Sequence, residues 1–194
     1  MAFTFTPTEI PDVVLIEVDT YPDHRGFFRE TYKESAYADG GFPWTFVQAN
    51  FSRSRKDVIR GLHFQYEPAG IGKLISVTHG RILDVAADIR PGSATYKRWV
   101  GAELSGENGS MLFVPPGFAH GFCALEDDCF VNYMMTGEFS PDHDAGVRWN
   151  DPDIGVDWPV AEPILSPKDA NQVFLNEIED RLRADYETAE EANV

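Results

Sequence analysis

The segment VIRGLHFQ (58–65) places a charged side chain and an imidazole inside an otherwise apolar run. An imidazole titrates near pH ~6.5, so a histidine in a core strand can transfer protons at neutral pH. Residues on one face of a strand recur every second position, but Arg60 and His63 are three apart. A regular strand puts one of them inside and the other outside. Both line one cavity only if the strand is irregular, and Gly61 is where a bulge could form.

A second histidine follows a proline- and glycine-containing turn in FVPPGFAHGF (113–122). Pro115 to His120 fits the Pro-x-Gly-x-x-His turn of cupin jelly rolls, which points the histidine into the barrel. Metal-binding cupins add His-x-His and a glutamate from an earlier strand, but here that strand reads His63-Phe64-Gln65, and Glu67 lies too close. A catalytic zinc takes three protein ligands. We therefore expect no metal, with a metal-dependent cupin oxygenase or isomerase as an alternative.

Short apolar or alternating runs separated by turn signals must position these residues. Many short strands at regular spacing, without intervening helices, predict an all-β antiparallel sandwich or barrel. Residues 31–38 predict a short helix and 174–187 an amphipathic one, whereas 140–170 reads as a long ordered loop, a length that is usually functional or a sign of missed elements. The predicted strands are 13–18, 46–51, 58–64, 73–78, 81–89, 98–104, 111–114, 120–125 and 129–135.

Length and composition restrict the kind of protein. A chain of 194 residues suits one domain, here 1–194 with its core at about 3–175 and an acidic helical tail at 175–194. The net charge of −16 argues against a nucleic-acid or membrane partner. Two cysteines, Cys123 and Cys129, are too few for a disulfide framework and indicate reduced thiols in the cytoplasm. The N-terminus lacks the features of a signal peptide.

Several motifs together resemble the dTDP-4-dehydrorhamnose 3,5-epimerase family. The likeness runs in order from about residue 3 to 175. The motifs are DHRGFFRE (23–30), QANFS (48–52), VIRGLHFQ (58–65), GKLISVTHGRILDVAADIRPGSATYKRW (72–99), FVPPGFAHGF (113–122), VNYMMT (131–136), GVRWNDPDIGVDWP (146–159) and LSPKD (165–169). The resemblance implies a cupin-type jelly roll that forms a homodimer and epimerises dTDP-4-dehydro-6-deoxy-D-glucose at C3 and C5, giving dTDP-4-dehydro-L-rhamnose in dTDP-rhamnose biosynthesis.

The residue chemistry agrees with that implication. A ketone at C4 makes the hydrogens at C3 and C5 acidic, so epimerisation needs a base, an acid on the opposite face and stabilisation of an enolate, but no cofactor. His63 is the expected base. By resemblance Asp169 orients it and Tyr133 protonates the opposite face. Lys73 and Arg60 are expected to stabilise the enolate oxygen.

Further residues are assigned to substrate binding by resemblance. The residues expected to bind the diphosphate or the nearby sugar are Arg25, Arg60 and Lys168. Those expected to bind the nucleotide are Glu30, Gln48 and Asn50. The Arg25–Glu30 stretch is expected to reach the site of the neighbouring subunit. His120 either lines the sugar pocket or is structural.

The chain departs from the family pattern in two places. Asp144 stands where relatives often carry a glutamate, which shortens its reach. Glu138 and Phe139 replace a pair of aromatics, so only Phe139 is left to stack on the base. The strictness for thymine is therefore open. A single-position 3- or 5-epimerase and a non-catalytic sugar-nucleotide binding module are the alternative functions, although a binder would need no acid–base pair.

Overall fold

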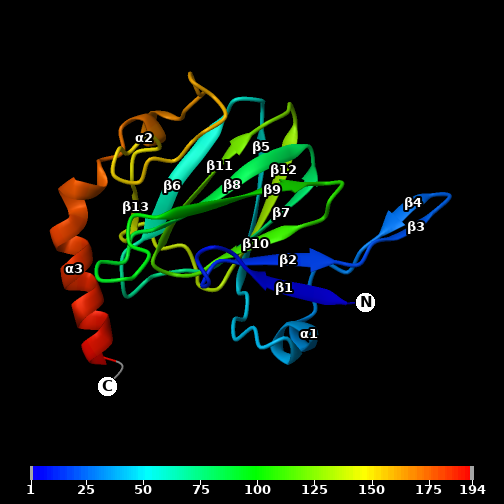
Figure 1. The fold of residues 1–194 in the computed structure, drawn as a ribbon, viewed down its shortest axis with the longest axis horizontal. Helices are drawn as coiled ribbons and strands as arrows, with labels where there is room; N and C mark the ends of the chain where they lie inside the picture. The colour runs from blue at the N-terminus through cyan, green and yellow to red at the C-terminus, as the bar shows by residue number, and fades with distance from the viewer. Residues whose placement is uncertain (1, 193–194) are drawn as a thin grey trace.

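The computed structural model describes residues 2–192, and most of its regular secondary structure is strand (Figure 1). The elements are β1 (Phe3–Pro7), β2 (Val14–Val18), β3 (Tyr21–Asp23), β4 (Gly26–Phe28), α1 (Glu34–Asp39), β5 (Gln48–Ser54), β6 (Ile59–Gln65), β7 (Lys73–His79), β8 (Arg81–Asp88), β9 (Trp99–Ser105), β10 (Met111–Val114), β11 (Phe118–Ala124), β12 (Cys129–Met135), β13 (Asp144–Gly146), α2 (Pro167–Ala170) and α3 (Leu175–Ala192).

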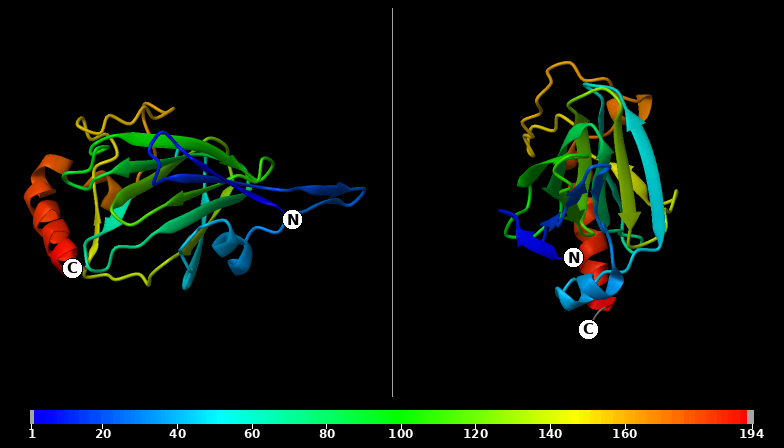
Figure 2. Two further views of the ribbon diagram at one scale, coloured as in Figure 1. Left: turned by 60° about the horizontal axis from the view of Figure 1, so that its bottom comes forward. Right: turned by 90° about the vertical axis from the view of Figure 1, so that its right-hand side faces the viewer.

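Two antiparallel sheets lie face to face, as Figure 2 shows. The first has the strand order β1-β2-β10-β7-β12-β5 and the second β13-β6-β11-β8-β9. Because neighbours in these sheets are mostly distant in sequence, the chain crosses between the sheets repeatedly. The predicted all-β antiparallel jelly roll with small peripheral helices is confirmed.

The central strands of both sheets are covered on both faces, whereas the edge strands β1 and β5 of the first sheet remain partly exposed. Side chains from both sheets, including Ile75 and Val131 of the first and Ile82 and Phe122 of the second, form the inner core. The outer face of the first sheet packs against an aromatic cluster around Tyr37 of α1. The outer face of the second packs against the 145–165 segment and α3. Strands covered on both sides are almost continuously apolar, which explains why β11 is buried at every position.

Several short elements were missed at the level of sequence. The strands β3, β4 and β13 have three residues each and α2 has four, too few to show a period of 2 or 3.6. β1 was also missed. The segment 140–170, expected to be a loop, contains β13 and the whole of α2. The two predicted helices exist with shifted ends, at 34–39 and 175–192. The last two residues of the predicted tail lie outside the described residues.

The β3–β4 hairpin projects from the body at the end of the molecule opposite α3 (Figure 1). Its register pairs Tyr21 with Phe28 and Asp23 with Gly26. Phe27 and Phe28 are 58% and 62% exposed. Large aromatic side chains left uncovered on a protruding hairpin are typical of a surface that contacts another molecule.

Strand β6 contains the irregularity that its sequence suggested. His63 pairs with His120 and Arg60 pairs with Phe122. Between these two pairs β6 advances by three residues and β11 by two, so β6 contains one extra residue. The extra residue restores a common face for Arg60 and His63. Gly61 makes this possible, because it has φ +139° and a Cβ there would lie 2.5 Å from the Cα of Gly121.

We expect Gly61→Ala to destabilise the fold by about 2–5 kcal/mol, the sum of a positive-φ cost of about 1–2 and an overpacking cost of about 1–3. Gly92→Ala is the control, because Gly92 has φ +92° but no atom within 4 Å of the added Cβ. Gly92→Ala should therefore lower the free energy of unfolding by the positive-φ cost alone, about 1–2 kcal/mol. Urea unfolding measures both, and equal losses would show that the Gly61–Gly121 approach is not constraining.

None of the helices in the described part of the chain is long and apolar enough to cross a membrane. Cys123 and Cys129 are buried and free.

Candidate active site

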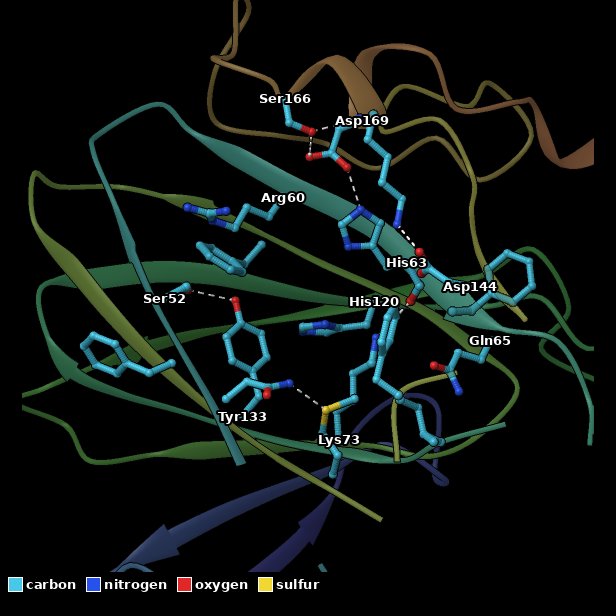
Figure 3. Close-up of a pocket in the computed structure, with 18 residues that line it drawn as sticks. Ser52, Arg60, His63, Gln65, Lys73, His120, Tyr133, Asp144, Ser166 and Asp169 are labelled. Carbon is cyan, nitrogen blue, oxygen red and sulfur yellow. Dashed lines mark hydrogen bonds and ion pairs between the residues drawn. The ribbon is translucent and has the colours of Figure 1, made fainter. Parts of the chain in front are cut away.

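A cavity of about 370 Å³ opens between the two sheets, close to the short helix α2 (Figure 3). Strands of both sheets line it, together with the loop after β12 and residues of α2. Most of the site residues predicted from sequence line it. The lining residues are Asn50, Phe51, Ser52, Arg60, His63, Phe64, Gln65, Ile71, Lys73, His120, Phe122, Tyr133, Met135, Phe139, Asp144, Ser166, Lys168 and Asp169.

His63 and Asp169 form a hydrogen-bonded dyad. Nε2 of His63 lies 2.5 Å from Oδ1 of Asp169, although 106 residues separate them in sequence. Ser166 fixes the carboxylate, because its hydroxyl donates to Oδ2 at 2.9 Å and accepts the Asp169 N–H at 3.1 Å as the cap of α2. The second ring nitrogen of His63 has no hydrogen-bond partner among residues 2–192 and is available to take a proton.

Charge balance favours the ionised form of the Asp169 carboxyl. Burial by itself would raise its pKa, but the hydrogen bond and charge of His63 and the Ser166 hydroxyl together hold the pKa below its usual range. A carboxylate in that state orients the imidazole and stabilises the imidazolium formed when His63 accepts a proton.

Tyr133 faces His63 from the other sheet. It lies on β12, whereas His63 lies on β6, so the two side chains reach the cavity from opposite walls (Figure 3). Its hydroxyl is 3.1 Å from the Ser52 hydroxyl. Burial raises the pKa of Tyr133 to about 12, so the phenol keeps its proton at neutral pH and can act as an acid.

Lys73 extends from the first residue of β7 toward the dyad. Its Nζ donates to the carbonyl oxygen of His63 at 3.1 Å. Burial lowers the pKa of the amine to about 8, although the charges of Asp144 and Asp84 partly oppose the shift. An ammonium ion close to the base can stabilise negative charge that develops on a bound ketone.

Arg60 also points into the cavity and is held by its neighbours. Its guanidinium donates to the Ser54 hydroxyl and to the Arg53 carbonyl, both at 3.0 Å. At the cavity rim, Lys168 forms an ion pair with Asp144. Phe139, 49% exposed, lies at the same rim and is free to contact a ligand.

Three of the predicted binding residues do not line the cavity. Gln48 instead accepts the Phe139 N–H at 2.9 Å and donates to Asn50 at 3.1 Å, so it ties the loop after β12 to β5. Arg25 lies at the tip of the β3–β4 hairpin in an exposed ion pair with Asp23. Glu30 follows the same hairpin, away from the cavity of its own chain.

Sequence reasoning missed Asp84. This carboxyl is 0% exposed on β8, and its Oδ1 lies 2.8 Å from Nε2 of His120. His120 therefore lines the cavity with an acidic partner behind it. The signal was present, because an aspartate within ILDVAADI (82–89) interrupts a run that is otherwise fit for a core. Ser52 and Ser166 gave no such signal.

In the part of the chain that the structure describes, no group of three or more His, Cys, Asp or Glu residues is arranged to hold a metal ion.

A jelly roll with an imidazole–carboxylate dyad and a phenol on opposite walls of one cavity defines an acid–base enzyme. The family model for dTDP-4-dehydrorhamnose 3,5-epimerase matches residues 7–177. The chain belongs to this family of isomerases.

Individual relatives agree over nearly the whole chain. The dTDP-4-dehydrorhamnose 3,5-epimerase of Methanothermobacter thermautotrophicus is 47% identical over 178 residues, 90% of this chain and 96% of that protein. The dTDP-4-dehydrorhamnose 3-epimerase of Streptomyces niveus is 35% identical over 190 residues, 97% of this chain and 92% of that protein. A crystal structure of the 3,5-epimerase of Legionella pneumophila in complex with dTDP-4-keto-L-rhamnose has a TM-score of 0.88 at 43% identity, covering 93% of this chain and 96% of that one.

Proposed function

We propose that the protein epimerises dTDP-4-dehydro-6-deoxy-D-glucose at C3 and C5 to dTDP-4-dehydro-L-rhamnose, as a step of dTDP-rhamnose biosynthesis. The observation that carries the proposal is the placement of the His63–Asp169 dyad and Tyr133 on opposite walls of one cavity. Inverting a carbon requires proton removal on one face and proton delivery on the other. These two groups supply both without a cofactor.

The reaction begins when the free ring nitrogen of His63 takes the proton from C3 or C5, which the C4 ketone makes acidic. Asp169 stabilises the resulting imidazolium. Lys73 and Arg60 stabilise the negative charge on the enolate oxygen, and one such donor can lower the barrier by about 3–4 kcal/mol. Tyr133 then delivers its proton to the opposite face of the carbon.

The remaining predicted residues bind the nucleotide part of the substrate. Arg60 and Lys168 are the cations of the cavity nearest to a diphosphate, and arginine can bind two phosphate oxygens at once. Asn50, Phe139 and Asp144 contact the nucleotide at the rim. Gln48 does not contact the nucleotide directly but holds Asn50 and the Phe139 backbone in place through hydrogen bonds.

The chain acts as a homodimer in this proposal. Arg25 and Glu30 do not reach the cavity of their own chain, whereas the β3–β4 hairpin that carries Arg25 projects outward with exposed aromatic side chains. The hairpin would complete the phosphate and nucleotide site of the partner. Light scattering at micromolar protein measures the mass of the assembly. Comparison of the wild-type protein with a variant lacking residues 22–27 tests whether the hairpin takes part in the dimer.

We also propose that residues 1–194 form one domain and that the protein is cytoplasmic. The first rests on α3, whose Leu175 and Leu182 are buried in the same cluster as Ile59 of β6 and Cys123 of β11. The second rests on two buried free cysteines.

Proton exchange in deuterated water tests the function. The substrate dTDP-4-keto-6-deoxyglucose should acquire deuterium at both C3 and C5 and change configuration at both. Label at one position only would instead assign a single-position epimerase, an alternative that the similarity to the Streptomyces niveus 3-epimerase keeps open. Absence of label at either position would assign a non-catalytic binding protein.

We expect turnover to fall as the pH rises through about 8, the pKa of Lys73. Below this pH the amine holds its proton and stabilises the enolate, and above it the charge is lost. Lys73→Arg should move this limb to higher pH, because a guanidinium stays charged above pH 12. A pH profile of kcat measures both effects. If kcat of the variant still falls at about pH 8, the fall is caused by a group other than Lys73.

A further inference from the structure

One buried acid–base pair takes no part in the proton removal by His63 or the proton delivery by Tyr133. The Asp84 carboxyl is fully buried and bonds His120 through Oδ1, but its Oδ2 has no hydrogen-bond partner in the described structure. A buried polar atom without a partner lowers the stability of the fold. Such a group in a core strand suggests a functional rather than a structural reason for the carboxyl.

The pair stands between the proposed base and the proposed acid. His120 on β11 is the direct ladder partner of His63 on β6. Its ring also meets the Tyr133 ring edge-on, with centroids 6.4 Å apart. In Figure 3 the His120 ring lies between Tyr133 and the His63 wall of the cavity.

Epimerisation at two carbons requires that the base and the acid be returned to their starting protonation states between the two inversions. After the first inversion His63 carries one proton too many and Tyr133 has lost one. The second inversion uses the same two groups in the same direction. A proton must therefore pass from His63 back to Tyr133 before the second carbon reacts.

We propose that the Asp84–His120 pair returns this proton while the substrate stays bound, so that His120 is the relay and Asp84 the positioning residue that lets it exchange protons. The inference rests on the proposed function and deepens it.

The transfer balances without a further reactant. At the start Oδ1 of Asp84 holds a proton directed at Nε2 of His120, and Nδ1 of His120 holds another. Nδ1 gives its proton to the Tyr133 phenolate while the Oδ1 proton moves to Nε2. Nδ1 then takes the proton of the His63 imidazolium, and the Nε2 proton returns to Oδ1. One proton has moved from His63 to Tyr133, and the pair is restored.

The electrostatics of the pair suit this starting state. Burial raises the pKa of Asp84 and lowers the pKa of His120, although each partner opposes the shift of the other. Both shifts favour a neutral pair with the proton on the carboxyl. A hydroxyl group of water or of the substrate can bridge the gap between the His120 and Tyr133 rings.

The test is Asp84→Asn, which keeps a hydrogen-bonding group of the same shape but cannot release a proton. Excess enzyme is mixed with dTDP-4-keto-6-deoxyglucose in deuterated water, and label at C3 and at C5 is followed separately. We expect the first position to be labelled within about threefold of the wild-type rate and the second to slow by about tenfold or more. A loss of positioning alone would slow both positions together.

Asp88→Asn is the matched control. Asp88 is a second fully buried aspartate of β8, but it bonds Arg90, Ser93 and Thr95 away from the cavity. Its loss should lower the melting temperature and leave the ratio of the two labelling rates unchanged. Wild-type ratios in Asp84→Asn, or equal slowing at both positions, would overturn the relay. No label with the wild-type protein would refute the proposed function instead.

If Asp84→Asn does not fold, the wild-type protein decides the question. An equal mixture of unlabelled substrate and substrate carrying deuterium at C3 or at C5 is converted in ordinary water with substrate in excess over enzyme. Nδ1 of His120 gives its own proton to Tyr133 before it takes the deuteron from His63, so the deuteron is held on His120 and reaches Tyr133 in the next relay step. The relay should therefore place part of the deuterium on a later substrate molecule, and product of the unlabelled substrate that is free of deuterium would contradict it.

Discussion

His63→Ala should abolish solvent exchange at both C3 and C5, lowering turnover by about 10²–10⁴-fold, the usual contribution of a general base. The reason is positional, since His63 is the imidazole that Asp169 holds at 2.5 Å and that faces the cavity with a free ring nitrogen. The measurement is the rate at which deuterium enters dTDP-4-keto-6-deoxyglucose.

Stability should change little in the same variant. The His63 side chain is 30% exposed, so alanine leaves a space that water can enter. Asp169 keeps its bonds to Ser166. His79→Ala is the control, because His79 is an exposed histidine of β7 outside this cavity and should retain full exchange. Full exchange in His63→Ala would show that another group is the base.

Tyr133→Phe should separate exchange from inversion. The variant keeps His63, which can remove a proton and return a solvent deuteron to the same face of the carbon. It lacks the phenol that delivers a proton to the other face. We expect formation of the inverted product to fall by about 10²–10⁴-fold while label still enters with retention of configuration. Proton NMR of the sugar ring measures both.

A buried tyrosine elsewhere provides the comparison. The hydroxyl of Tyr37 donates to the Thr31 carbonyl within the aromatic cluster around α1, and Tyr37 does not line the cavity. Tyr37→Phe should cost about 1 kcal/mol of stability and leave inversion unchanged. Inversion at the wild-type rate in Tyr133→Phe would show that the second proton comes from elsewhere, for example from water.

Much of the fold was predictable because its signals are local. A strand covered on both faces must be apolar along its length, so β6, β7, β8, β11 and β12 stand out in the sequence. The three-residue strands and α2 did not, because so few residues carry no period. The bulge in β6 was anticipated from the odd spacing of Arg60 and His63. The direction of this bulge and the close approach of Gly61 to Gly121 could not be predicted from the sequence.

The order of the residues was enough to show which chemical groups are present: an imidazole in a core strand, and a tyrosine and a lysine at strand positions. The family resemblance then attached roles to these groups. Which of these groups come into contact became visible in the folded molecule. The fold placed Asp84 behind His120, moved Gln48 out of the cavity lining and directed Arg25 away from its own cavity. The physical reason is that burial patterns are properties of neighbouring residues, whereas the contact of His63 with Asp169 depends on sheet order and register, which all the strands fix together.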